Sequence, residues 1–358
     1  MKFELLLAAF DLKDLIGVPL RASVSIPTIV FALGAIGLNL HYGFTGLLNV
    51  GMVAFMAAGS YGMAIAFTQG VPGGILVAMV CGLLFSVIIA LLIGIPALRL
   101  RGDYLAIVTI AIGEVMRVSA RSQRLINITG GPFGLPSIED RGNDVSLSDR
   151  IGIDWNPLYD TENPTRSFDV LWTDIFNFDA KALWLMIIGW ALVVLMTILV
   201  WRLVNSPWGR VIKAIREDED AARALGKNVF SYKLQSLIIG GVIGAIAGII
   251  RTLDNSFVQS EQFRPQTTFF IWTSLILGGA ASKWGPVVGA AIFWFSLQFV
   301  EEAVRQLVEN DWIPDWLIDS NDIGRIRLIM MGVMLAALMI WRPQGLLGKK
   351  EEALLDVR

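Results

Sequence analysis

Residues 181–204 read KALWLMIIGWALVVLMTILVWRLV, an apolar run whose only charged residues, one lysine and one arginine, lie near its two ends. The hydrocarbon core of a bilayer is about 30 Å thick, and a helix of about 20 apolar residues crosses it. The run has that length and composition. We therefore predict a membrane-spanning helix here.

Similar apolar blocks occur on both sides of this run. No alternating pattern of about ten residues recurs, as a membrane β-barrel would need. Gly240, Gly244 and Gly248 are spaced four apart in one block and predict close helix packing. The sequence predicts an all-α, polytopic transmembrane domain of about 8–10 spans, interrupted helices included. The other blocks lie near 21–40, 49–69, 72–97, 103–122, 232–252, 286–306 and 324–341, with a shorter one at 267–281.

Composition favours one membrane domain over the whole chain, 1–358. Hydrophobic residues make up 55% of it, the mean hydropathy is +0.62, and the charged 17% cluster between the blocks. A net charge of −2 argues against nucleic acid as a partner, which would need a basic face. The one cysteine, Cys81, cannot form an internal disulfide. We expect residues 1–20 to form a short amphipathic lead-in helix that is retained.

Basic residues concentrate in three connections, and the positive-inside bias places these connections in the cytoplasm. They are the stretch 202–233, the connection that contains Arg99, and the tail 342–358. The loops 123–180 and 307–323 are rich in acidic residues, and alternation of the spans makes them exterior, provided that the short block 267–281 counts as a crossing.

The weakly charged segment 39–49, NLHYGFTGLLN, separates the first two blocks. It forms either a short loop at the surface or an interrupted helix inside the membrane. Irregular backbone is tolerated there only where it faces protein or water. Both alternatives stay open, and with them the side on which the first residue lies. We interpret His41, the one histidine, as a polar residue at an interface rather than a proton relay.

Residues 206–226 read SPWGRVIKAIREDEDAARALG and predict a short helical segment outside the membrane. Pro207 suits a helix start. The acidic run 217–220 suits the first turn of a second short helix, and Gly226 suits its left-handed C-terminal cap. Ala221 and Ala222 would leave a small-residue face on which another protein can sit. An ordinary charged loop is the alternative interpretation.

This segment carries a resemblance to a known family. Asp220, Ala221 and Ala222, followed by Gly226, resemble the EAA loop of bacterial ABC-importer permeases, with Asp in place of the usual Glu. The wider stretch is similar to the branched-chain amino acid permease family of the LivH/LivM type. Three further segments resemble the same family, and the second of them resembles the LivM branch in particular. They are 37–51, 102–135 and 277–290.

The resemblance implies a B12-permease-like architecture in the bacterial inner membrane and import of amino acids, either branched-chain and neutral ones or a broader set. It implies a homologous second permease, most simply in a heterodimer, two cytoplasmic ABC ATPases, a periplasmic substrate-binding protein and membrane lipid as partners. No GxxxxGK[ST] phosphate loop occurs, so we expect ATP and magnesium on the ATPases and no enzyme activity, cofactor or metal in this chain. In this family the segment 205–229 would be the coupling helix. The predicted coupling residues are Arg216, Glu217, Asp218, Glu219, Asp220, Ala221, Ala222 and Gly226.

Ionisable residues inside spans are costly and suggest function. Glu114 and Arg117 lie three apart on one predicted helix face, as a structural pair or along a polar path for zwitterions. Arg251 and Asp254 mark another span end, and we interpret them as interfacial. The predicted substrate pathway residues are Asn39, Thr45, Asn49, Thr109 and Glu114.

Three other functions remain to be weighed. Urea or short-chain amide permeases resemble the same family. An ion-coupled secondary transporter would need carboxylates at the membrane midplane and usually an inverted repeat. A membrane-embedded enzyme would need a catalytic cluster, which the sequence does not contain.

Overall fold

The structure is a computed structural model. It describes residues 12–100, 102–135, 139–140, 143–146, 167–169, 177–310, 323–342 and 344–348. Most of the predicted lead-in helix, of the loop 123–180 and of the tail 342–358 lies outside the described residues.

The described chain is almost entirely helical, with two short β-hairpins. Every apolar block predicted from the sequence is helical, and a break at Ser25 divides the first block. The long helices are α2 (Leu12–Val24), α3 (Ile26–Leu38), α4 (Met52–Thr68), α5 (Gly74–Ala97), α6 (Gly102–Arg121), α9 (Ala180–Val204), α12 (Val229–Asn255), α13 (Pro265–Gly278), α14 (Gly285–Glu309) and α15 (Ile323–Trp341). The shorter elements are η1 (Asn39–Phe44), η2 (Gln123–Leu125), α7 (Ile126–Thr129), η3 (Gly131–Phe133), β1 (Glu139–Asp140), β2 (Asn143–Ser146), β3 (Ser167–Asp169), β4 (Asn177–Asp179), α10 (Pro207–Glu217), α11 (Glu219–Ala224) and η6 (Ser260–Phe263).

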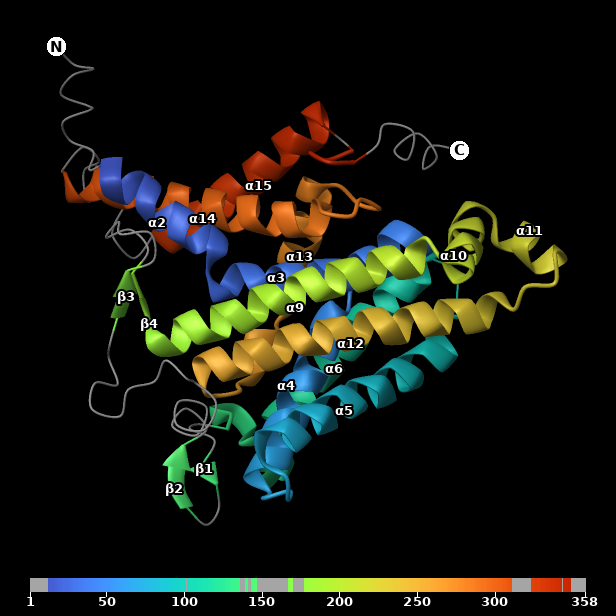
Figure 1. The fold of residues 1–358 in the computed structure, drawn as a ribbon, viewed down its shortest axis with the longest axis horizontal. Helices are drawn as coiled ribbons and strands as arrows, with labels where there is room; N and C mark the ends of the chain where they lie inside the picture. The colour runs from blue at the N-terminus through green and yellow to red at the C-terminus, as the bar shows by residue number, and fades with distance from the viewer. Residues whose placement is uncertain are drawn as a thin grey trace.

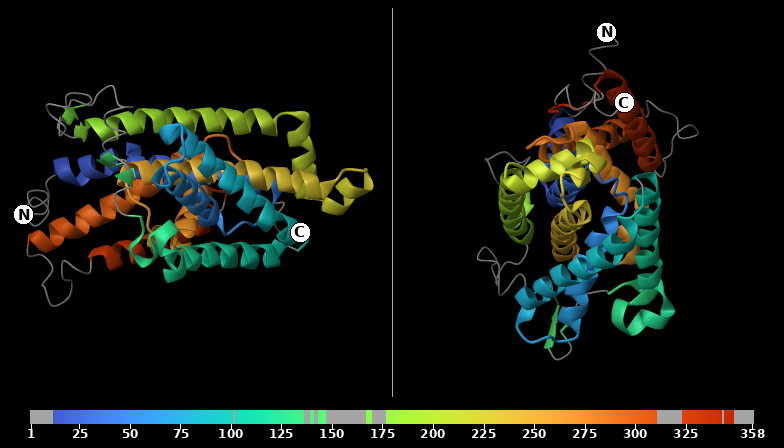
Figure 2. Two further views of the ribbon diagram at one scale, coloured as in Figure 1. Left: turned by 90° about the horizontal axis from the view of Figure 1, so that it is seen from below. Right: turned by 90° about the vertical axis from the view of Figure 1, so that its right-hand side faces the viewer.

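The long helices run roughly along one axis of the molecule (Figure 1). The antiparallel pairs β1–β2 and β3–β4 lie at one end, which we call the hairpin end. The helices α10 and α11 lie at the opposite end, beside the α5–α6 connection that carries Arg99 (Figures 1 and 2). We call this the basic end. Successive long helices from α3 onward alternate in direction between the two ends, α13 included, as the predicted order of spans requires.

Among the described residues, five helices are long and apolar enough to cross a membrane. The apolar helix α4 is shorter, with 17 residues, and α13 has 14. The outward faces of α5 and α9 are apolar, as lipid-facing helices would be, with Leu84, Leu92, Leu195 and Ile198 exposed. The five candidate spans are Ile26–Phe44, Gly74–Ala97, Ala180–Val204, Val229–Asn255 and Gly285–Glu309.

The core of the bundle forms where α12 crosses α3 and α4. A Cβ atom on Gly240 would lie 2.6 Å from the carbonyl oxygen of Gly37, and one on Gly248 would lie 2.1 Å from that of Met56. Gly244 contacts the Met52 side chain in the same row. The backbones approach this closely because these positions lack side chains. The predicted role of the glycines in helix packing is confirmed.

Candidate functional site

The segment between α3 and α4 is a buried helix break, which decides between the two alternatives left open by the sequence. Helix α3 continues into the π-helical turn η1, and the chain is then irregular until α4 begins. Asn39, His41, Thr45 and Asn49 are each at most 2% exposed. A buried break leaves backbone polar groups without helical partners, and the surrounding helices must supply them.

Side chains of two other helices, α6 and α13, form hydrogen bonds with backbone groups of the break where α4 begins. The backbone N–H of Val50 donates to Thr109 Oγ1 of α6 at 3.0 Å, and that of Val53 donates to Thr268 Oγ1 of α13 at 3.2 Å. The Trp272 indole N–H, also from α13, donates to the Asn49 carbonyl at 3.0 Å. The break is therefore stabilised by specific hydrogen bonds from neighbouring helices.

His41 is fully buried at the centre of this break. Its Nε2 lies 3.2 Å from the Leu237 carbonyl oxygen on α12, and its Nδ1 lies 3.0 Å from Asn49 Nδ2. A neutral imidazole protonated on Nε2 satisfies both contacts, since Nε2–H donates to the carbonyl and Nδ1 accepts from the amide. A Cβ atom on Gly240 would lie 2.3 Å from Nε2, so glycine there makes room for the ring. His41 is an interfacial residue between η1 and α12, as predicted.

Asn39 connects the break to the glycine-rich turn between α13 and α14. Its Oδ1 accepts from the Ala281 backbone N–H at 2.8 Å, and its Nδ2 donates to the Ser282 carbonyl at 3.0 Å. Gly43 packs on the same contact, because a Cβ atom there would lie 2.1 Å from Asn39 Oδ1. The break and the turn are thus held together by one side chain.

The segment 205–229 contains two helices, α10 and α11. Ser206 caps α10, and its hydroxyl accepts from the Gly209 N–H at 3.4 Å, with Pro207 in the first turn as predicted. Asp218 ends α10 and caps α11, since its Oδ1 accepts from the Ala221 N–H at 2.9 Å. Gly226 has φ +76° and terminates α11 in the predicted left-handed conformation.

The faces of α11 differ in part from the prediction. Ala221 is exposed, but Ala222 is 4% exposed and packs with Ile215 and Val229, so its predicted place on the open face is wrong. With six residues, α11 is too short for a periodicity that would have revealed this. Leu225 is 80% exposed beside it. The open face therefore consists of Ala221, Ala224 and Leu225.

The charges of α11 are paired with its surroundings. Glu219 forms ion pairs with Arg223 at 2.9 Å and with Lys233 at the start of α12. Asp220 pairs with Arg223 at 3.0 Å. The pairs fix α11 against α12 while its open face stays free of protein contacts from the described part of the chain.

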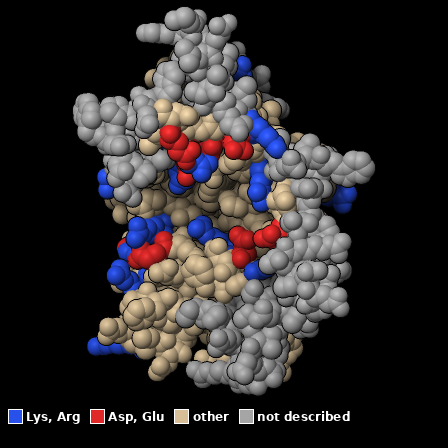
Figure 3. Space-filling model, turned by 90° about the vertical axis from the view of Figure 1, so that its left-hand side faces the viewer, with Lys and Arg blue, Asp and Glu red and all other residues tan. Residues whose placement is uncertain are grey.

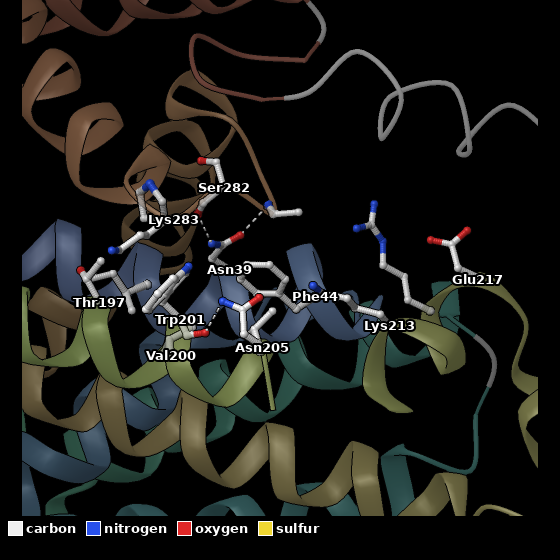
Figure 4. A pocket seen from close by; sticks show the side chains of 15 residues that line it. Asn39, Phe44, Thr197, Val200, Trp201, Asn205, Lys213, Glu217, Ser282 and Lys283 are labelled. Carbon is white, nitrogen blue, oxygen red and sulfur yellow. Dashed lines mark hydrogen bonds between the residues drawn. The ribbon is translucent and has the colours of Figure 1, made fainter. Parts of the chain in front are cut away.

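A cavity of about 340 Å³ lies between the segment 205–229 and the helix break (Figure 4). Arg216 of α10 reaches across to donate from Nη1 to the Gly43 carbonyl oxygen at 2.6 Å. Lys213 lines the same cavity, and Lys283 enters it from the α13–α14 turn, 4.2 Å from the Trp201 ring. Glu217 is the acidic residue among the lining side chains. The cavity has an excess of positive charge.

The predicted pathway residues do not form one lining. Asn39 borders the cavity, whereas the polar groups of Asn49 and Thr109 are used within the break. Thr45 Oγ1 donates to the Leu40 carbonyl at 2.8 Å and lies 2.7 Å from Ser236 Oγ. Glu114 lies apart from them, in an ion pair with Arg117, which also contacts Glu261 of η6 at 3.0 Å. The pathway assignment stays a prediction.

Several residues of the break were missed by the sequence prediction. Ser236, Thr268, Trp272 and Ser282 supply hydrogen bonds to it from α12, α13 and the turn after α13. Each is a polar or indole group within or at the end of an apolar block. Their position in apolar blocks could have identified them in the sequence, because a polar group inside a span needs a partner.

Known proteins resemble the chain over most of its length. Residues 21–340 match the model of a family described as branched-chain amino acid transport system, permease component. The chain is 31% identical to the high-affinity branched-chain amino acid transport system permease protein LivM of Salmonella typhimurium, over 91% of this chain and 70% of that protein. The LivM of Escherichia coli is 30% identical, with the same shares covered. A probable LivM of Methanocaldococcus jannaschii is 22% identical, over 88% of this chain and 90% of that protein. No solved structure matches the chain.

Proposed function

The chain belongs to the branched-chain amino acid transport system permease family, and from that premise we propose that it carries branched-chain and other neutral amino acids across the bacterial inner membrane by alternating access. It is a multi-pass membrane protein and a permease subunit of an ABC importer. Partners of the ATPase and binding-protein kinds follow from that membership. We further propose a heterodimer with a homologous permease, two ATPases on the cytoplasmic side and a periplasmic binding protein.

The hydrogen bond from Arg216 to Gly43 is the observation that carries the proposed mechanism. In the proposal, an ATPase docks at the basic end on Ala221, Ala224 and Leu225. When the ATPases close on ATP, α11 moves with them, and α10 follows because Asp218 caps one helix and ends the other. Arg216 then displaces the helix break.

Motion of the break would reach the rest of the bundle through two connections. Asn39 joins it to the turn between α13 and α14. The Val50 and Val53 N–H groups join it to α6 and α13. A break held by hydrogen bonds, rather than by continuous helix, can exchange one arrangement for another if each buried polar group finds a partner in both. The break is thus a candidate hinge between outward-open and inward-open states.

The distribution of basic residues supports a cytoplasmic position for the proposed ATPase-docking segment. Arg99, Arg210, Lys213 and Arg223 gather at the basic end, which the positive-inside bias puts in the cytoplasm. Urea and short-chain amides are not favoured as substrates, because the relatives named above are amino acid permeases. Ion coupling is also not supported by Glu114, whose carboxylate is paired with Arg117.

Reconstitution tests the proposed function. The full importer, assembled with its partner permease, ATPase and binding protein in liposomes, should accumulate radiolabelled L-leucine only with ATP. Uptake by this chain without an ATPase would contradict the proposal and favour a secondary transporter. ATP-driven uptake of urea but not leucine would favour the amide alternative.

A further inference from the structure

A second cavity, of about 220 Å³, opens near the hairpin end, away from the coupling segment. It lies where the first turn of α3, the last turn of α12, and helices α13 and α14 meet. The face of the molecule at this end is hollowed at its centre, with acidic and basic side chains around the hollow (Figure 3). On the proposed orientation, this face receives substrate from the exterior.

Two opposite charges line the cavity from the same helix. Arg251 and Asp254 lie three residues apart on α12 and therefore on one face. Both side chains are half-buried, and neither charged group forms a hydrogen bond or a close ion pair with another described residue, although the two charges attract each other along the helix. Lys181 contributes charge near Asp254, but its ammonium donates to Ser256 Oγ at 2.7 Å and to the Asp254 backbone carbonyl.

A third polar group on the wall is also unused. The Trp294 indole Nε1 is buried and has no hydrogen-bond partner among the described residues, and Trp294 lines the same cavity. A buried donor without a partner costs about 1–3 kcal/mol, and half-buried charges without a close hydrogen-bonded partner are also costly near the membrane. Together these groups offer a cation, an anion and a donor to an incoming ligand.

The remaining wall is apolar and aromatic. Val30, Phe31 and Phe270 line it, and the Phe31 and Trp294 rings meet edge to face with centroids 5.2 Å apart. Apolar walls with a few oriented polar groups are typical of small-molecule sites. The ligand that fits has one positive and one negative group close together and an apolar remainder.

We propose that this cavity binds the zwitterionic head of a neutral amino acid on its way through the permease, a proposal that rests on the function given above. Arg251 takes the carboxylate, for which its planar guanidinium is suited, and Asp254 takes the ammonium group. The aliphatic side chain lies against Val30, Phe31 and Phe270. One ligand neutralises both charges, whereas urea would neutralise neither.

Direct binding tests the site without relying on transport. [³H]-L-leucine is titrated onto the purified permease complex in nanodiscs, without binding protein, for the wild type and the variants R251Q and D254N. Loss of a charge-assisted contact should weaken binding at least about tenfold. The matched controls R124Q and D14N remove exposed charges of the same sign outside the cavity and should bind as the wild type does. R251K should retain part of the affinity because it keeps the cation.

Analogues separate recognition from general damage to the fold. The wild type should prefer leucine to leucinamide, which lacks the carboxylate, and to 4-methylpentanoate, which lacks the amine. R251Q should lose the first preference only, and D254N the second only, whereas a structural defect would weaken all three ligands alike. Unchanged leucine affinity in both variants, equal weakening of all ligands, or no binding to the wild type at about 10 mM would overturn the site. Failure of ATP-driven leucine uptake by the wild type would instead count against the proposed function.

Discussion

Arg216 Nη1 lies 2.6 Å from the carbonyl oxygen of Gly43, so α10 is hydrogen-bonded directly to a buried turn inside the bundle. The Gly43 carbonyl belongs to a π-helical turn, where ordinary helical pairing is disturbed. The contact is charge-assisted and short, and it connects two segments that are 173 residues apart. This contact gives a displacement of α10 a direct route to the buried turn, and the Trp208 indole N–H of α10 donates to Gln235 Oε1 of α12 at 2.8 Å as a second link to the spans.

Replacement of Arg216 by methionine should therefore uncouple the importer. Methionine keeps much of the side-chain length but cannot donate to Gly43, and a hydrogen bond from a charged donor contributes about 1.5–3 kcal/mol. We expect ATP hydrolysis to continue while leucine uptake per ATP falls about tenfold or more. The measurement is paired ATPase and uptake assays in proteoliposomes. R210M, which removes an exposed arginine of the same helix, is the control. Equal losses in both variants would show a general effect of charge at this surface.

Gly226 should be replaceable only by residues that tolerate a left-handed backbone. Its φ is +76°, and a Cβ atom there would meet nothing within 4 Å, so conformation alone restricts the position. A β-branched residue in this region costs at least about 1–2 kcal/mol. G226V should loosen the end of α11 and lower co-purification of the ATPase several-fold. G226N should retain most of it, because asparagine visits this region more readily. Wild-type pull-down and uptake in G226V would contradict the coupling role of the segment.

The helix break should be intolerant of any side chain at Gly240. A Cβ atom would lie 2.3 Å from His41 Nε2 and 2.6 Å from the Gly37 carbonyl oxygen, so α3 and α12 would have to separate. Overpacking of this kind costs about 1–3 kcal/mol. G240A should lower the melting temperature of the protein in detergent. Melting is measured by size-exclusion chromatography of samples after heating. G332A, on α15 where a Cβ atom meets nothing, should leave it unchanged or slightly raised. Similar melting temperatures of G240A and G332A would mean that α3 and α12 do not pack closely at Gly240.

The spans could be predicted from the sequence because an apolar block of about 20 residues has few alternatives to a membrane helix. The start of α10 at Pro207 and the end of α11 at Gly226 were predictable for a similar reason, whereas Glu217, predicted in the first turn of the second helix, is the last residue of α10. Pro207 and Gly226 act within their own turn of the chain, so that local sequence is sufficient.

The helix break was one of two alternatives that the sequence left open, and its hydrogen-bond partners were not predictable because they lie far away in the sequence. Ser236 and Thr45 are 191 residues apart, and Trp272 and Asn49 are 223 apart. No periodicity in one sequence pairs such residues. The sequence predicts an interfacial Arg251 because it cannot show that Arg251 and Trp294, 43 residues apart in the chain, line one cavity.

Acid should weaken the ion-pair cluster that holds η6 against α6, in which Glu261 contacts Arg117, Arg121 and Arg264. The hydrogen bond from Arg264 is the main cause that lowers the pKa of Glu261, and the charges of Arg264, Arg117 and Arg121 add to it against a smaller effect of burial. A carboxyl with a lowered pKa adds stability above its ordinary value of 4.5, and this contribution is lost as the pH falls through the lowered value. The melting temperatures of the wild type and E261Q should therefore differ at neutral pH and converge below pH 4.5. Because the cluster is partly exposed, about 1 M salt should also narrow the difference. A difference that persists in acid would show that Glu261 acts through packing rather than charge.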